Sequence, residues 1–489
     1  MSCTPLHVTA LPLFTPEQPA FVIGAGPAGL TAAYELVGRH EPVVVCETDD
    51  QVGGLSRTVC QGGFRFDIGG HRFYTKSEPV LEMWRDVLAN DFLKRPRLSR
   101  IFYRGHFFDY PLKPLNVLVG LGLVESVRVL LSYAWATLSP VRPEVSFADW
   151  VSNRFGRRLY RIFFETYTEK VWGIPPHTIG AQWAAQRIKG LSLASAVRHM
   201  LFPPGKGGTA RTLIEEFDYP RLGPGMMWEA VADRVTAAGG HIWLASRVDA
   251  LTHTGSRIDT VSLGRPGTRA VVPVGHVIST MAIRDLVQAL DPAPPADVLA
   301  AAERLKYRDF LTVALVLDAP DVFPDNWIYI HDDTVRVGRI QNFKNWSPEM
   351  VPDAALTCLG LEYFCFEGDG LWSMADADLI ALATRELQTL GLSGTGAVIS
   401  GFVVRARKAY PVYDEGYQDA LGRVRAYLAR FENLQLVGRN GMHKYNNQDH
   451  SMLTAMLAVR NLYGERHDLW AVNTDDEYGE EVREVLVRT

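Results

Sequence analysis

Apolar and polar positions follow two different periods near the start of the chain. Residues 20–23 form a short apolar run that predicts a buried strand, and residues 28–37 repeat their apolar positions at helical spacing. A β-branched run follows at 42–46 and ends at an acid, Glu47. A strand, a helix and a strand in this order predict a βαβ unit with parallel strands.

The later pattern changes along the chain. From 80 to 213 it is rich in helical spacing and aromatic residues, with few strand signals. An amphipathic helix is predicted at 226–237. Strands are then expected at 241–244, in alternating runs up to 278, at 310–316 and at 356–366, and the region 433–462 is typical of a strand, a glycine turn, a long loop and a helix.

The most apolar stretch of the chain covers residues 115–138. Glu125 and Arg128 interrupt it, so it lacks the uninterrupted run of about 18 apolar residues that a spanning helix needs. We interpret it as a largely buried helix; the alternative is a helix that dips into a membrane surface. The residues up to Pro19 lack a signal-peptide pattern. We therefore expect a cytoplasmic protein with no stable membrane insertion.

Composition narrows the class of protein but not its activity. The 489 residues are 47% hydrophobic and 21% charged, which is typical of globular proteins and excludes a mainly disordered chain. A net charge of −5 argues against nucleic acid as a partner. The five cysteines are odd in number and none has CxxC spacing, so we expect neither a disulfide framework nor a metal site.

A glycine motif occupies residues 24–29 and matches G-x-G-x-x-G. It directly follows the first predicted strand and opens the first helix, which is the context of a dinucleotide site. Gly24 allows the tight turn, Gly26 lets the backbone approach a pyrophosphate, and Gly29 lets the helix pack closely on the strand. The helix N-terminus offers N–H groups to phosphates. Glu47 can accept hydrogen bonds from the ribose hydroxyls.

A second cluster, Gly53 and Gly54, precedes Arg57, which is a charge-matched partner for the same pyrophosphate. The spacing of acid, glycine pair and arginine resembles the flavoprotein superfamily of amine oxidases, phytoene desaturases and UDP-galactopyranose mutases. This resemblance favours FAD over NAD. It also implies that Val248 lies on a strand beneath the adenine and contacts it through its backbone.

The resemblance implies an α/β fold, with a Rossmann-type FAD-binding domain and an interleaved helical and β-sheet substrate domain. The expected FAD-binding parts are 18–80, 220–290 and 401–489; a mainly helical substrate or cap region covers 81–219, and a substrate-domain sheet covers 291–400.

Two further motifs add candidate cofactor residues. After Gly70, a small residue that lets its loop lie close to a flat ring, His71 can donate to an isoalloxazine carbonyl or carry a proton near it. Residues 438–451 resemble the mutase C-terminal signature. There the resemblance assigns FAD contacts to Gly438, Arg439 and Gln448, a substrate-facing tyrosine to Tyr445, and a helix N-terminus that stabilises negative charge on a reduced flavin. Asn447 stands where the bacterial mutases usually have aspartate.

The same resemblance suggests residues on the substrate side. A Lys-Val-Trp segment precedes Arg187, which matches a phosphate-binding arginine, and Arg308 matches a second diphosphate clamp. Tyr329 and Tyr410 match tyrosines near the substrate. Each has a structural alternative, namely an ion-paired arginine or a tyrosine that packs in the core.

The leading hypothesis is an FAD-dependent mutase-type isomerase acting on a nucleoside-diphosphate sugar. The resemblance implies interconversion of pyranose and furanose through a reduced-flavin N5–sugar adduct, with NAD(P)H as a candidate external reductant and a homo-oligomer as an open expectation. Asn447 makes a sugar other than galactose plausible. The rival is an FAD-dependent oxidase or desaturase of the protoporphyrinogen oxidase or phytoene desaturase kind, for which the segment 115–138 suits an apolar substrate. A non-catalytic flavin-binding protein is the third hypothesis.

Overall fold

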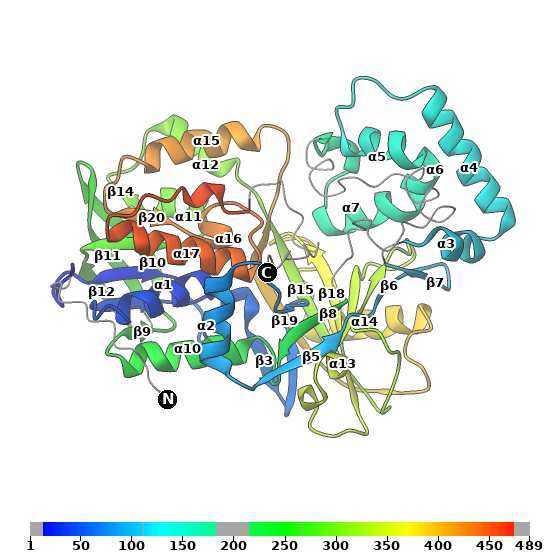
Figure 1. The fold of residues 1–489 in the computed structure, drawn as a ribbon, viewed down its shortest axis with the longest axis horizontal. Helices are drawn as coiled ribbons and strands as arrows, with labels where there is room; N and C mark the ends of the chain where they lie inside the picture. The colour runs from blue at the N-terminus through cyan, green and yellow to red at the C-terminus, as the bar shows by residue number, and fades with distance from the viewer. Residues whose placement is uncertain (1–12, 111, 182–214, 266, 474–489) are drawn as a thin grey trace, which may run out of the picture.

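The βαβ unit predicted at the start of the chain is present and forms the centre of a parallel sheet. Strand β1 (Ala20–Ile23) is followed by helix α1 (Pro27–Val37) and strand β2 (Val43–Cys46), and the two strands pair in parallel. The computed structural model describes residues 13–110, 112–181, 215–265 and 267–473 (Figure 1). The fold is of the α/β class, as expected.

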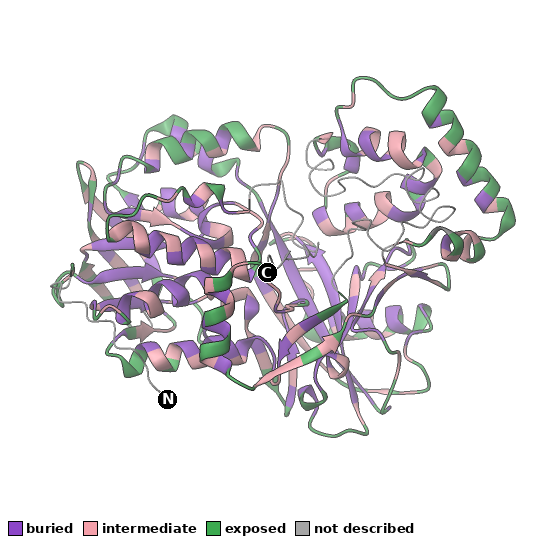
Figure 2. Ribbon diagram, viewed as in Figure 1, coloured by how far each residue is buried: buried purple, intermediate pink, exposed green. Residues whose placement is uncertain are grey.

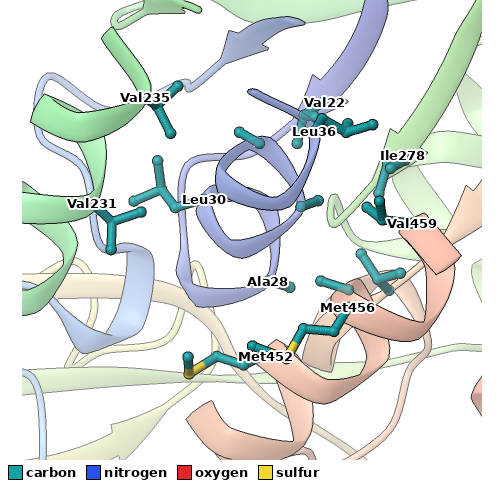
Figure 3. Close-up of a cluster of buried hydrophobic side chains, with 14 of the residues drawn as sticks. Val22, Ala28, Leu30, Leu36, Val231, Val235, Ile278, Met452, Met456 and Val459 are labelled. Carbon is teal, nitrogen blue, oxygen red and sulfur yellow. The ribbon is translucent and has the colours of Figure 1, made fainter. Parts of the chain in front are cut away.

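The parallel sheet takes its strands from three separated parts of the chain. Their order is β20 (Leu434–Leu436), β13 (His276–Ser279), β1, β2 and β9 (His241–Trp243). Helices α10 (Gly225–Ala237) and α17 (Gln448–Leu462) pack on either side of α1 over one face. Figure 3 shows apolar side chains from these elements, such as Leu30, Val231 and Met456, in one buried cluster. This core fixes the N-terminus of α1 at one end of the sheet.

The opposite face of the parallel sheet packs on a second apolar cluster. Its members include Phe21 and Val277 from the parallel strands. Other members of this cluster come from a four-stranded sheet and three helices. The strands are β10 (Arg247–Thr254), β11 (Arg257–Arg265), β12 (Thr268–Pro273) and β14 (Leu290–Asp291), and the helices are α11 (Ile283–Gln288), α12 (Ala296–Glu303) and α15 (Tyr417–Leu428).

A larger mixed sheet lies beside this unit. Its seven strands run in the order β19 (Val398–Pro411), β15 (Tyr307–Leu317), β18 (Thr357–Cys365), β17 (Arg339–Asn342), β16 (Trp327–Ile330), β6 (Ser99–Tyr103) and β7 (His106–Asp109). Helix α14 (Asp376–Thr389) packs against it. The strands predicted at 310–316 and 356–366 are confirmed. The boundary expected between 400 and 401 falls inside β19, which pairs with β15 along most of its length.

Three strands occupy a segment in which the pattern gave few strand signals. They are β5 (Phe92–Pro96), β6 and β7, and β5 pairs with β8 (Glu216–Pro220). The turn between β6 and β7 places both Arg104 and Gly105 at positive φ. A turn of this kind normally carries Asn-Gly or Asp-Gly, so Arg-Gly hides the hairpin in the sequence.

A group of helices, the cap helices, projects beyond the mixed sheet. They are α3 (Pro114–Leu121), α4 (Leu123–Leu138), α5 (Phe147–Phe155), α6 (Arg157–Tyr160) and α7 (Thr166–Trp172).

The largely buried helix expected at 115–138 is wrong. The stretch forms two helices divided at Gly122, where φ is +78°, and much of α4 is exposed (Figure 2). Leu123 keeps 82% of its surface exposed, whereas the buried positions of α4 are Ser126, Val129 and Ala136. Ser126, Val129 and Ala136 therefore form the packed face of α4, and most of its leucines and Trp135 face outward.

Candidate active site

One cavity of about 1520 Å³ takes its lining from both large sheets. It is larger than the usual 300–1,000 Å³ of a small-ligand pocket, so it has room for a dinucleotide and a second molecule. The predicted residues that line it are Gly24, Gly26, Glu47, Gly54, Arg57, Gly70, His71, Val248, Tyr329, Tyr410, Gly438, Arg439, Tyr445, Asn447 and Gln448. Gly29 and Gly53 are not among the lining residues, but each packs against one that is, Gly29 against Gly24 and Gly53 against Arg57.

The first glycine motif makes a turn that other residues could not make. Gly24 has a φ of +98°, and a Cβ there would overlap the hydroxyl of Thr280. A Cβ on Gly29 would overlap the carbonyl oxygen of Gly24, so α1 can start this close to β1 only with glycine. Both contacts agree with the roles that the motif predicts for these residues.

The second glycine cluster lies against the first. A Cβ on Gly54 would be 3.1 Å from the Cα of Gly26, and the Gly53 amide donates to the Ala25 carbonyl at 2.8 Å. Gly438, with a φ of +79°, approaches Ala28 on the same helix end. We call the surface formed by Gly24, Gly26, Gly54 and Gly438 the glycine wall. It exposes bare backbone at the N-terminus of α1, where an anion is stabilised.

Glu47 is held at the edge of the glycine wall by two backbone amides. The N–H of Ala25 donates to Oε2 at 2.7 Å, and that of Asp49 donates to Oε1 at 3.0 Å. Burial raises the pKa of this carboxyl. Both oxygens retain lone pairs that can accept hydroxyl groups. Arg57 instead forms an ion pair with Asp49, so its charge is shared with a carboxylate of this chain.

The Gly-Gly-His loop contacts the mixed sheet as well as the cavity. A Cβ on Gly70 would lie 3.1 Å from Nε2 of Gln341 and 3.2 Å from the Trp346 ring. His71 places Nε2 at 2.8 Å from the carbonyl oxygen of Ile68, so that nitrogen carries the proton. Burial lowers the pKa of His71 to about 4. The ring is therefore neutral at pH 7, and its Nε2 proton is donated to the backbone.

Arg439 follows the glycine wall and holds two distant segments. Its Nε donates to the Asn446 carbonyl and its Nη1 to the Ala409 carbonyl, each at 2.9 Å. The guanidinium also lies 4.7 Å from the centre of the Tyr445 ring. Because both bonded partners are backbone carbonyls, this cation brings positive charge to the cavity lining.

Two more predicted site residues, Asn447 and Gln448, lie at the start of α17. Asn447 is the N-cap, and its side chain and that of His450 form a reciprocal capping box. Asparagine thus performs a local structural task at the position where the mutases usually have aspartate. Gln448 donates to the Arg72 carbonyl at 3.1 Å, and its Oε1 is buried without a hydrogen-bond partner among the described residues.

The opposite side of the cavity is built from strands of the mixed sheet. Arg339 forms an ion pair with the fully buried Glu362 and donates to the hydroxyl of Tyr410 at 3.0 Å. Gln341 donates to the same carboxylate at 2.8 Å, while its own Oε1 is buried and unpaired within the described part of the chain. We call the surface formed by Tyr329, Arg339, Gln341 and Tyr410 the tyrosine wall.

Aromatic rings extend the tyrosine wall. Tyr410 stacks on Tyr445 with ring centres 5.6 Å apart, and burial raises the pKa of Tyr410 to about 12. Tyr329 lies 5.6 Å from Tyr167, edge to face. Tyr167 and Trp172 also line the cavity. The sequence singled out their segment, but it did not identify these two side chains as site residues.

Of the two predicted arginine clamps, only Arg308 lies among the described residues. Arg308 is absent from the cavity lining; it donates to the Phe364 carbonyl at 2.8 Å and lies 4.2 Å from the Phe366 ring. It thus fits the alternative of a packed arginine. Arg187 lies outside the described residues.

Sequence reasoning missed Arg339, which supplies a cation to the tyrosine wall. The signal was the alternation of Arg339 and Gln341, two polar side chains on one face of a strand that is otherwise buried.

Lys170, the lysine of the Lys-Val-Trp segment, does not line the cavity. Its ammonium donates to the carbonyls of Ile330, Asp332 and Val337 at 2.6–3.3 Å, and burial lowers its pKa to about 8. It therefore ties the cap helices to the mixed sheet. Among the described residues that line the cavity there are ten Lys and Arg against five Asp and Glu, although the chain is net negative. The cavity suits anionic ligands.

The sequence is similar to a known protein family and to characterised relatives. The model of the family "Flavin containing amine oxidoreductase" matches residues 27–416. Coproporphyrinogen III oxidase of Mycobacterium tuberculosis is 25% identical over 442 residues, which cover 83% of this chain and 90% of that protein.

Solved structures resemble the fold over nearly its full length. A reduced UDP-galactopyranose mutase aligns with a TM-score of 0.81 at 22% identity, covering 94% of this chain and 97% of that one. A putative protoporphyrinogen oxidase from Exiguobacterium aligns with a TM-score of 0.69 at 17% identity, covering 93% and 100%.

Proposed function

The chain belongs to the flavin containing amine oxidoreductase family, and from that premise we propose that it is a mutase-type isomerase that uses FAD and acts on a nucleoside-diphosphate sugar. We take the reduced flavin as the active form. When bound and reduced, the flavin supplies the electron-rich centre that such a rearrangement requires.

The glycine wall fits FAD by its own geometry. It presents bare backbone and a helix N-terminus where a pyrophosphate would bind, with Glu47 beside it for ribose hydroxyls. Two buried side-chain oxygens in the lining, Oε1 of Gln448 and Oδ1 of Asn440, have no hydrogen-bond partner among the described residues. A bound cofactor or its ordered water would satisfy them, since buried polar atoms are normally paired.

The main observation in favour of a sugar substrate is the polar cluster of the tyrosine wall. Arg339 and Gln341 bind the buried Glu362, Tyr410 accepts from Arg339, and Oε1 of Gln341 has no hydrogen-bond partner among the residues that the structure describes. A polyhydroxylated ring can satisfy such groups, whereas an apolar substrate would leave them buried and unpaired, at a cost of about 1–3 kcal/mol each.

The chain's own residues would bind and orient the substrate. Arg339 uses two hydrogen bonds in holding Glu362 and Tyr410, and its planar fork has further N–H donors for a diphosphate oxygen. Tyr410 keeps its proton at neutral pH because its pKa is about 12, so its hydroxyl can donate. The rings of Tyr410 and Tyr445 exclude water from one side.

A direct assay tests the isomerase. The purified protein is reduced anaerobically with dithionite and given UDP-galactopyranose and related nucleotide sugars. We expect a ring-contracted isomer without net flavin oxidation. Sugars that return unchanged from the fully reduced enzyme, across nucleotides and epimers, would refute the proposal.

Matched variants test the tyrosine wall in that assay. Gln341→Leu should raise KM about tenfold by removing one hydrogen-bonding group from the substrate side. Gln435→Leu makes the same chemical change on β20, away from the cavity lining, and should leave KM unchanged. Equal KM values for the two variants would remove Gln341 from the substrate site.

Oxidation of a porphyrinogen is the second candidate function, and the match to coproporphyrinogen III oxidase over 83% of this chain favours it. The excess of cations in the cavity lining also suits the carboxylates of such a substrate. The oxidase hypothesis predicts oxygen consumption and porphyrin fluorescence when coproporphyrinogen III is added to the oxidised protein. That result, together with no sugar isomerisation, would replace the isomerase by the oxidase.

A further inference from the structure

Helix α4 carries its large apolar side chains on the outside of the molecule. At about 100° per residue, Leu123, Val124, Val127, Leu130, Leu131, Trp135 and Leu138 fall within an arc of about 140°. Each of them exposes between 46% and 83% of its surface. We call these seven residues the outer stripe. It runs the whole length of α4, about 24 Å.

The outer stripe cannot turn inward, because the other face of α4 is already packed. Val129 contacts the cluster that contains Phe108 and Phe163. Glu125 forms an ion pair with Arg158, and the hydroxyl of Ser126 donates to the Gly122 carbonyl at 2.7 Å. The helix is therefore fixed with its apolar side toward solvent, on the outer edge of the molecule (Figures 1 and 2).

More apolar side chains continue the outer stripe at both ends. Leu115 and Val119 are exposed on α3, and Val141 and Val145 are exposed in the segment after α4. A contiguous surface of this kind marks an interaction site, since soluble proteins rarely leave one uncovered.

The charge around the outer stripe indicates what kind of partner it binds. Residues 104–181 contain nine Lys and Arg against six Asp and Glu, a net charge of +3 in a chain of net −5. Arg128 stands beside the outer stripe with 62% of its side chain exposed and lies 3.5 Å from the carboxylate of Glu125, which also pairs with Arg158, and Arg142 is exposed just after α4. A two-fold dimer through this surface would set one positive cap against another. An anionic lipid surface would instead meet it with opposite charge.

We propose that the outer stripe docks the protein on an anionic membrane surface, with α4 lying in the plane of the interface. Its apolar face enters the boundary between headgroups and acyl chains, and the arginines meet the headgroups. No helix among the described residues is long and apolar enough to cross a membrane, so this attachment is peripheral.

Vesicle flotation of the full chain tests the docking. We expect the protein to float with vesicles of phosphatidylcholine and phosphatidylglycerol, less with phosphatidylcholine alone, and less again at high salt. Leu131→Glu and Leu138→Glu should each lower the partition coefficient on the order of tenfold. Val271→Glu is the matched control, because Val271 is 63% exposed on β12, and it should float as the parent protein does.

Two results would overturn the proposal. One is a parent protein that stays with the bulk solution in the presence of anionic vesicles. The other is a dimer that Leu131→Glu converts to a monomer in light scattering, with no flotation of either form, which would assign the outer stripe to a second copy. Quenching of Trp135 fluorescence by brominated lipid, which Trp135→Phe should abolish, measures insertion independently of flotation. Leu131→Glu and Leu138→Glu should unfold at the same temperature as the parent protein, so that a loss of flotation cannot be due to misfolding.

Discussion

The glycine wall and the tyrosine wall face one cavity but are built in opposite ways. Three residues of the glycine wall come from two short segments, 24–29 and 53–57, and they act through what they lack, a Cβ. The tyrosine wall gathers side chains from three different strands, β16, β17 and β19, and its charged groups, Arg339 and Glu362, depend on one another. A site made of backbone can be recognised from a motif, whereas a site made of cross-strand contacts becomes visible only when the strands are placed.

The largest effect is expected from Gly29→Val. A Cβ there overlaps the carbonyl oxygen of Gly24, which belongs to the backbone and cannot move aside. The free energy of unfolding should fall by more than about 3 kcal/mol and the protein should lose its flavin. Absorbance of bound flavin and thermal unfolding measure this. Gly370→Ala, where a Cβ meets nothing within 4 Å, is the control; flavin retained in Gly29→Val would contradict the close packing.

Breaking the ion pair of the tyrosine wall should have the next largest effect. Glu362→Ala leaves the partly buried Arg339 guanidinium without its carboxylate, which should cost about 3 kcal/mol of unfolding free energy in denaturant titration. The double variant Arg339→Met, Glu362→Met should regain most of that stability but no substrate binding. If the double variant bound substrate normally, the pair would be structural only.

A buried acid gives a pH dependence with a definite sign. Asp67, on β4 (Phe64–Asp67), accepts hydrogen bonds from Thr58 and Tyr219, and burial raises its pKa to about 7 from 3.8. Because the folded state holds this proton more tightly, stability from Asp67 is lost as pH rises toward 7. Between pH 5 and 8 the parent should lose on the order of 2 kcal/mol relative to Asp67→Asn. Parallel stability curves for the two proteins would place the pKa elsewhere.

The smallest effect should come from Tyr410→Phe. The variant keeps the ring that stacks on Tyr445 and removes only the hydroxyl that accepts from Arg339. We expect a loss of about 1 kcal/mol in unfolding free energy and a moderate rise in KM. Tyr427→Phe, on α15 outside the cavity lining, provides the comparison. A change in flavin binding without a change in KM would indicate that Tyr410 contacts the cofactor and not the substrate.

The sequence was sufficient where local chemistry determines local shape. The strand, glycine turn and helix at 20–37 were predictable because apolar spacing and the Gly24 turn act within a few residues. Arg308 was misplaced because nothing in its own segment says which face of β15 meets the cavity.

Spacing also cannot tell whether an apolar face has a partner. The exposed side of α4 has the same helical pattern as a buried one, and only the placement of its neighbours shows which side is covered. For the same reason the sequence did not identify Arg339, because its ion pair with Glu362 forms only when β17 and β18 lie side by side.

Strand β19 is one of the connections between the two halves of the molecule. It pairs with β15 in the mixed sheet, while its last residues are bonded to the glycine-wall region: Ala409 accepts from Arg439, and Lys408 accepts from Asn440 at 2.9 Å. The parallel sheet likewise closes only when β20, near the end of the described chain, joins β13. Neither half can therefore be excised as a continuous fragment, and the two should melt as one cooperative unit, so that loss of cofactor binding and loss of the mixed sheet coincide on heating.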